Sequence, residues 1–182
     1  MEHIEYEERV MIKESDYKKV IDDLMSKGYE IKPFTIENIY LDNDEKIMQK
    51  GGMMLRIRNV LDKQELTLKI RNKDNSNVEI NETVENHPII DEALNHKFKE
   101  FKEVVRLVTQ RIELKIDDYL LVIDKNMYHN IVDYDVEIET DSQAKAKKII
   151  LEYCEKYNWK YKSDYKVKSA RAFAALKKDG II

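Results

Sequence analysis

The chain combines many short segments of two-residue periodicity with a few segments of helical periodicity. Successive side chains of a strand point to opposite faces, so alternation of apolar and polar residues predicts strands. By this criterion we expect strands at 3–12, 36–42, 53–60, 64–71, 78–85, 107–116, 119–125, 132–140 and 160–168. Apolar residues three and four apart predict helices at 17–27, 89–105, 141–157 and 169–178, with a short polar helical turn at 44–49. This pattern predicts an α+β fold.

No repeat, low-complexity tract or linker interrupts the 182 residues. A chain of this length can bury a substantial core as one unit. We therefore expect a single domain over residues 1–182.

Charged residues recur at every second position in several predicted strands, and most of these rows carry one sign. The rows are Glu5, Glu7 and Arg9; Arg56 and Arg58; Lys69 and Arg71; Asp135, Glu137 and Glu139; and Lys166 and Lys168. For any single strand, a solvated outer face is the simpler interpretation. The set as a whole favours another arrangement, because like charges two positions apart repel unless a counter-charge lies between them. A sheet closed into a barrel would hold these rows inside, with the apolar rows facing outward beneath the helices.

Charge, hydropathy and cysteine content exclude several function classes. With 32 basic and 36 acidic residues the net charge is −4, so we expect no general affinity for nucleic acid. No apolar run is long enough for a membrane span, and the acidic N-terminal segment is unlike a signal peptide. Cys154 is the single cysteine and lies at helical spacing among apolar residues, so it is expected to pack in the core. A cytoplasmic location is the default for such a chain.

The charged rows also carry a resemblance to a known family. Glu5-Tyr6-Glu7-Glu8-Arg9 resembles the ExExK signature of the CYTH superfamily, the triphosphate tunnel metalloenzymes. The resemblance continues in order through Leu55–Arg58, Leu66–Lys69, Val108–Arg111, Asp133–Glu139 and Lys168–Phe173. The ordered set carries the resemblance, and the chain is most similar to the bacillus-type branch of bacterial members.

This resemblance implies a fold and an activity. The implied fold is an eight-stranded antiparallel β-barrel, the triphosphate tunnel, with flanking helices. The implied activity is Mg²⁺- or Mn²⁺-dependent hydrolysis of a triphosphate, with inorganic triphosphate the leading substrate. Three alternatives stay open: an adenylyl cyclase, a thiamine triphosphatase, and a non-catalytic module that binds triphosphate or polyphosphate. The oligomeric state also stays open, with a homodimer as one alternative.

The resemblance also assigns roles by motif position. The metal ligands would be Glu5, Glu7, Asp135, Glu137 and Glu139, with Glu82 and Asp124 as further tunnel acids. The phosphate-binding residues would be Arg9, Arg56, Arg58, Lys69, Arg71, Arg111, Lys168 and Arg171. The catalytic set would be Glu5, Glu7, Arg9, Lys69 and Lys168. Because a tunnel carboxylate contributes little packing, we expect replacement of Glu137 or Glu139 by glutamine to preserve folding.

Arg9 is the departure from the family signature, which has lysine there. A guanidinium stays protonated across the accessible pH range, so Arg9 is chemically unable to act as a general base. We therefore predict that Arg9 contacts a phosphate oxygen. If the lysine of the signature handles a proton, this substitution impairs hydrolysis and favours the binding-module alternative.

Overall fold

The computed structural model describes residues 6–71, 77–84 and 101–181; the side chains of 69–71 and 77–84 are outside this description. The described helices are α1 (Glu14–Ser26), α2 (Ile47–Lys50), α4 (Gln143–Tyr157) and α5 (Lys168–Lys178). The described strands are β1 (Tyr6–Ile12), β2 (Phe34–Asp42), β3 (Met53–Val60), β4 (Lys63–Arg71), β5 (Asn77–Val84), β6 (Lys102–Ile116), β7 (Tyr119–Tyr128) and β8 (Ile131–Thr140). None of the helices in these ranges is both long and apolar enough to cross a bilayer.

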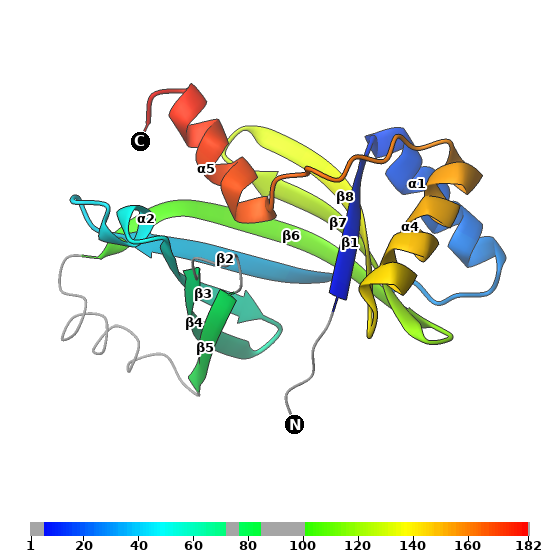
Figure 1. Cartoon of the computed structure of the whole chain (residues 1–182), viewed down its shortest axis with the longest axis horizontal. Helices are drawn as coiled ribbons and strands as arrows, with labels where there is room; N and C mark the ends of the chain where they lie inside the picture. Colours follow the sequence, from blue (N-terminus) through cyan, green and yellow to red (C-terminus); the bar gives the residue numbers. More distant parts are fainter. Residues whose placement is uncertain (1–5, 72–76, 85–100, 182) are drawn as a thin grey trace. The chain divides into compact units, whose positions relative to one another are not determined.

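The strands form one sheet in the order β1-β8-β7-β6-β2-β3-β4-β5 (Figure 1). The β1–β8, β2–β3, β3–β4 and β4–β5 ladders are antiparallel. This architecture confirms the predicted α+β fold. Strands β1 and β5 are the two ends of the order, and no pairing of described residues joins them. The predicted closure into a barrel is therefore not confirmed.

The chain divides into two compact units. Unit 1 comprises Met1–Phe34, Thr109–Met127 and Ile131–Lys168; unit 2 comprises Thr35–Val108, Tyr128–Asn130 and Ser169–Ile182. Strand β6 is divided between the two units. The terminal residues Phe34 of β2, Tyr128 of β7 and Lys168 of α5 also fall in the other unit from the rest of their elements.

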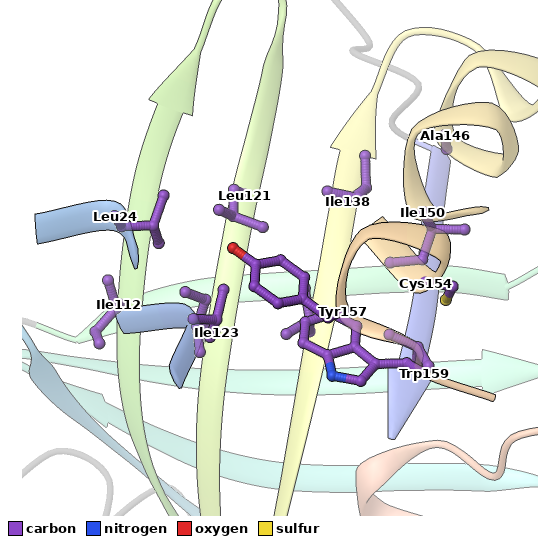
Figure 2. Packing of buried hydrophobic residues seen from close by; sticks show 13 residues of the cluster. Leu24, Ile112, Leu121, Ile123, Ile138, Ala146, Ile150, Cys154, Tyr157 and Trp159 are labelled. Atoms are coloured by element: carbon purple, nitrogen blue, oxygen red, sulfur yellow. The ribbon is translucent and has the colours of Figure 1, made fainter. Parts of the chain in front are cut away.

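In unit 1, helices α1 and α4 bury the apolar side of the strands. Val10 of β1 lies opposite Val136 of β8, and both are buried. Helix α1 contributes Val20 and Leu24, which are four residues apart and share one side of the helix. Helix α4 contributes Ala146, Ile150 and Cys154 at the same spacing, and Figure 2 shows them gathered with Leu121, Ile123 and Ile138 of the strands. The predicted core position of Cys154 is confirmed.

In unit 2, the apolar rows of β2 to β4 form a second core. Its buried residues are Leu41, Met48, Leu55 and Ile57. The Asp42 carboxylate anchors the short helix α2, because it accepts hydrogen bonds from the backbone N–H groups of Met48 and Gln49, both at 3.1 Å. Phe173 of α5 packs edge-on against Tyr40 of β2, with ring centroids 5.9 Å apart.

Two sequence predictions differ from the structure. Residues 160–167 form no strand, and Lys168 is the first residue of α5. Tyr161 and Tyr165 of this segment pack against the unit 1 core instead. Trp159, just before the segment, stacks on Tyr157 with ring centroids 4.7 Å apart. The predicted helix at 89–105 lies mostly outside the described residues, and Lys102–Val105 belongs to β6. The buried positions Val105, Leu107 and Thr109 continue the two-residue period of that strand.

Candidate active site

The face of the unit 1 sheet opposite the helices is lined with charged side chains. The β1–β8 register places Arg9 opposite Glu137 and Glu7 opposite Glu139. Because Val10 and Val136 occupy the intervening positions and point into the core, strand alternation directs the charged neighbours to the other face. The sequence pattern predicted this separation of rows.

Glu137 lies at the centre of the charged face. Its side chain is almost completely buried and forms an ion pair with Arg9. Its Oε1 atom lies 3.0 Å from Lys168 Nζ, and its Oε2 atom lies 3.3 Å from Arg111 Nη2. One carboxylate thus contacts three cations.

Asp124 is a second buried carboxylate on the same face. Arg111 donates to it in a bidentate arrangement, with Nε–Oδ1 at 3.0 Å and Nη2–Oδ2 at 2.8 Å. Lys168 forms an ion pair with the same Oδ2 atom. This geometry places Asp124, which the sequence suggested only as a further acid, among the central residues.

Asp135 completes the group. Its Oδ1 atom lies 3.4 Å from Lys168 Nζ and 3.9 Å from Arg9 Nε. Lys168 therefore contacts all three buried acids, although it begins a helix and does not lie on the predicted strand. We call this set the ionic cluster; it consists of Arg9, Arg111, Lys168, Asp124, Asp135 and Glu137.

Glu137, Lys168 and Arg9 keep their charges at neutral pH. Burial disfavours the ionised form of Glu137, but attraction to Lys168, Arg9 and Arg111 outweighs it and lowers the pKa to about 2. Burial likewise opposes the charge on Lys168, yet the neighbouring carboxylates Glu137, Asp135 and Asp124 raise its pKa. The pKa of Arg9 is also raised, because Glu137 and Asp135 together outweigh its burial. Lys168 and Arg9 are thus held as cations, which suits anion binding and not general-base chemistry.

Two groups of carboxylates have the chemistry of a divalent-cation site. The ligand atoms of Glu7, Glu137 and Glu139 lie within 4.8 Å of one another, as do those of Asp124, Asp135 and Glu137. Mg²⁺ and Mn²⁺ prefer carboxylate oxygen ligands. The second group is embedded among the three cations of the cluster. The first group reaches the surface through Glu7, whose side chain is 56% exposed. A divalent cation from solvent can therefore reach the first group more easily than the second.

Comparison with known proteins identifies the family. Residues 3–170 match the CYTH domain. The chain belongs to the CYTH family. No curated protein sequence matches it.

Solved structures share the fold of this CYTH chain. A putative adenylate cyclase from Bacillus halodurans is 23% identical, with a TM-score of 0.72 over 94% of this chain and 98% of the other. A putative adenylyl cyclase from Hippeastrum, described as having a dominant triphosphatase activity, is 17% identical, with a TM-score of 0.68 over 98% and 97%. A putative adenylate cyclase from Vibrio parahaemolyticus is 11% identical, with a TM-score of 0.63 over 96% and 99%. At these identities the likeness shows the fold alone.

The remaining candidate residues of the CYTH motifs lie in unit 2 or outside the description. Arg56 and Arg58 share one face of β3, and Arg58 Nε donates to Asn38 Oδ1 at 3.1 Å. Arg171 is half-buried in α5. Glu5 lies outside the described residues, as do the side chains of Lys69, Arg71 and Glu82.

The β4–β5 register bears on one of these positions. It pairs Glu82 with Leu66, in the backbone row that also contains Ile57, and pairs Glu79 with Lys69. The backbone position of Glu82 therefore belongs to the row of Leu66 and Ile57, and not to the alternate row that contains Arg56 and Arg58.

Two residues of the charged face had no predicted role. Asn126 and Thr109 are both buried and bond to each other. Asn126 follows Asp124 by two positions in β7, and Thr109 precedes Arg111 by two in β6, so strand alternation places each on the charged face. The two-residue period places both residues on this face, but a neutral side chain shows a role only once its hydrogen-bond partners are known.

Proposed function

We propose that this chain is a divalent-metal-dependent triphosphatase, with inorganic triphosphate as its leading substrate. The observation that carries the proposal is the contact of Arg9, Arg111 and Lys168 with one buried carboxylate, Glu137. Burying ionised groups costs desolvation free energy, and buried ion pairs seldom stabilise a fold more than apolar residues would. A costly charged arrangement on a sheet face is typical of a functional site.

The partial exposure of the three cations supports binding of a polyanion. Their side chains are 13% (Arg9), 18% (Arg111) and 15% (Lys168) exposed, whereas Asp124 and Asp135 are fully buried. The carboxylates thus hold the cations in place while part of each cation stays accessible. Guanidinium groups bind phosphate oxygens through two parallel hydrogen bonds, and the ammonium group adds a point charge. Phosphoryl transfer depends mainly on such positioning and charge stabilisation.

The donor set suits the metal that this family implies. Glu7, Glu137 and Glu139 would hold Mg²⁺ or Mn²⁺, with Asp135 and Glu5 as further proposed ligands. When bound, the cation would neutralise phosphate charge and polarise a phosphoryl oxygen. Arg9 and Lys168 would bind and orient the phosphate chain from the cluster.

The family resemblance also supports a tunnel architecture and further binding residues. We propose that residues 1–182 act as a single closed tunnel domain in the cytoplasm. Arg56, Arg58, Lys69, Arg71 and Arg171 are proposed phosphate-binding residues of that tunnel. The role of Glu82 as a tunnel acid stays a prediction of the resemblance, although its backbone position is paired with Leu66 and not with the row of Arg56 and Arg58.

Adenylyl cyclase activity is the second candidate. The relatives from Bacillus halodurans and Vibrio parahaemolyticus are described as putative adenylate cyclases. The Hippeastrum relative carries the same description together with a dominant triphosphatase activity. We therefore place hydrolysis first.

The test is a product screen on the purified chain. Inorganic triphosphate, ATP and thiamine triphosphate are each incubated with Mg²⁺ or Mn²⁺, and with EDTA as the control. We expect one orthophosphate and one pyrophosphate per inorganic triphosphate and water consumed, and no reaction in EDTA. Cyclic AMP and pyrophosphate from ATP would favour the cyclase. Tight triphosphate binding without turnover would favour the binding module.

A further inference from the structure

A chain of neutral side chains connects to the ionic cluster through Asp135. The Thr109 hydroxyl donates to Asn126 Oδ1 at 2.8 Å. The Asn126 amide nitrogen donates to Asp135 Oδ2 at 2.7 Å and to Asp133 Oδ1 at 3.0 Å. Asn126 and Asp135 are fully buried and Thr109 is 2% exposed, so bulk water does not replace these partners.

Chemistry fixes the orientation of the Asn126 amide. Its nitrogen carries two hydrogens, and each finds a carboxylate oxygen. In the flipped orientation the amide oxygen would face both carboxylates, and the nitrogen would lie against the Thr109 hydroxyl. The two carboxylates can only accept, so they select this orientation, and the Thr109 hydroxyl donates to the amide oxygen on the other side.

The bond from Asn126 determines which oxygen of Asp135 faces the cluster. Oδ2 is held by the amide, while Oδ1 lies 3.4 Å from Lys168 Nζ and 3.9 Å from Arg9 Nε. A carboxylate held at one oxygen by a short hydrogen bond loses its freedom to rotate about χ2. Asn126 thereby fixes the oxygen that Lys168 and Arg9 face.

We infer that Asn126 is a positioning residue of this site, acting through Asp135 and itself held in place by the hydrogen bond from Thr109. The inference rests on the proposed function, since it concerns how the same cluster is prepared for triphosphate and metal. An asparagine suits this place better than an aspartate, because a further carboxylate beside Asp133 and Asp135 would add repulsion without adding a donor. Partners of this kind often change affinity or activity by about 10- to 100-fold when removed.

A double-mutant cycle between Asn126 and Asp135 tests the inference. We expect Asn126→Leu to lower kcat/KM on inorganic triphosphate by about 10- to 100-fold. In the Asp135→Ala background the same change should cost less than about threefold, because the acceptor through which it acts is already removed. Equal losses in both backgrounds would show that Asn126 acts independently of Asp135 and would overturn the inference.

A second pair of variants guards against misfolding of Asn126→Leu. Thr109→Val keeps the shape but removes the hydroxyl, and Thr109→Ser restores it. We expect Thr109→Val to lower kcat/KM several-fold and Thr109→Ser to recover most of the loss. Thr140→Val is the matched control, since it removes another buried hydroxyl that bonds to an aspartate, at 3.0 Å, outside the cluster. Equal losses for the valine and serine variants at position 109 would contradict the inference.

Binding of Mn²⁺ alone, followed by electron paramagnetic resonance, gives a readout independent of turnover. Weaker Mn²⁺ binding by Asn126→Leu, but not by Thr140→Val, is the expected result; unchanged binding would count against the inference. If the wild-type chain hydrolyses none of the triphosphates, the proposed function fails while the Mn²⁺ comparison still decides the inference. If the wild type neither hydrolyses triphosphate nor binds Mn²⁺, both fail.

Discussion

Two arginines of the same strand form similar ion pairs in different surroundings. In unit 1, Arg111 binds Asp124 through two hydrogen bonds of 3.0 and 2.8 Å. In unit 2, Arg106 binds Glu103 through two hydrogen bonds of 3.0 and 2.6 Å, and Glu37 at 2.5 Å. Asp124 is fully buried, whereas the Glu103 side chain is 43% exposed.

The difference shows that pairing geometry alone does not identify a site. Solvent screens the Arg106 group, and such surface pairs contribute at most about 1 kcal/mol. Glu137 in the ionic cluster has no such screening, and its cationic partners hold its pKa low against the effect of burial. Only the buried group carries a charge arrangement that demands a functional explanation.

The largest expected contrast is between Glu137→Gln and Glu37→Gln. Glu137→Gln leaves three cations without their shared carboxylate, so we expect activity to fall by at least about 100-fold and stability by about 3 kcal/mol. Glu37→Gln should change stability by less than about 0.5 kcal/mol and leave activity intact. Steady-state kinetics and urea unfolding of both variants measure this contrast. Similar effects of the two substitutions would remove the distinction between the regions.

This expectation revises the one drawn from the sequence. There, replacement of Glu137 by glutamine was expected to preserve folding because a tunnel carboxylate packs little. The contacts with Arg9, Arg111 and Lys168 make Glu137 a structural partner as well. Glu139 is only partly buried, so Glu139→Gln is still expected to fold normally while losing metal-dependent activity.

A smaller contrast is expected from exchanging arginine for lysine in both regions. Lysine cannot reproduce the two parallel bonds from Arg111 to Asp124, so Arg111→Lys should lower kcat/KM about 10-fold. Arg106→Lys should change it less than about twofold, because that pair is exposed. Kinetics on inorganic triphosphate measure both. Full activity of Arg111→Lys would show that the bidentate geometry has no role in catalysis.

Arg9→Lys tests the departure from the family signature within the cluster. If Arg9 binds phosphate, the variant should keep kcat within about threefold and raise KM several-fold, because a point charge replaces a fork. Saturation kinetics separate the two constants. A gain of orders of magnitude in kcat would mean that the natural chain is an impaired enzyme, and the binding-module alternative would then be preferred.

The smallest expected effect concerns the exposed pairing between α1 and α4. Asp23 accepts hydrogen bonds from Lys156 Nζ and Tyr157 Oη, both at 2.6 Å, and these lower its pKa. A lowered carboxyl pKa stabilises the fold above the unfolded value of about 4 and loses that effect as pH falls. Asp23→Asn should therefore cost up to about 1 kcal/mol at pH 7 and less at pH 3. Urea unfolding at both values measures the difference; a cost that grows toward acid pH would contradict this sign.

Strand alternation predicted the charged face of unit 1 well. The rows containing Arg9, Asp135 and Glu137 lie where the two-residue period placed them. The reason is physical: Val10, Val136 and Ile138 must face the helices, so their neighbours must face the other way.

Other features of the site depend on tertiary contacts that periodicity does not contain. Trp159, Tyr161 and Tyr165 alternate like strand residues, but their rings pack against the unit 1 core from a segment without strand structure. Lys168 reaches the acids from the start of a helix, which no strand pattern predicts. Asn126 was missed because a neutral side chain becomes informative only when its two carboxylate partners are seen.

The most direct test of the central claim is a crystal structure with Mn²⁺ and a non-hydrolysable triphosphate analogue. We predict anomalous Mn²⁺ density among the carboxylates of Glu7, Glu137 and Glu139, with phosphate oxygens within hydrogen-bond distance of Arg9, Arg111 and Lys168. Bound metal and analogue away from these residues, with the ionic cluster unchanged, would contradict it.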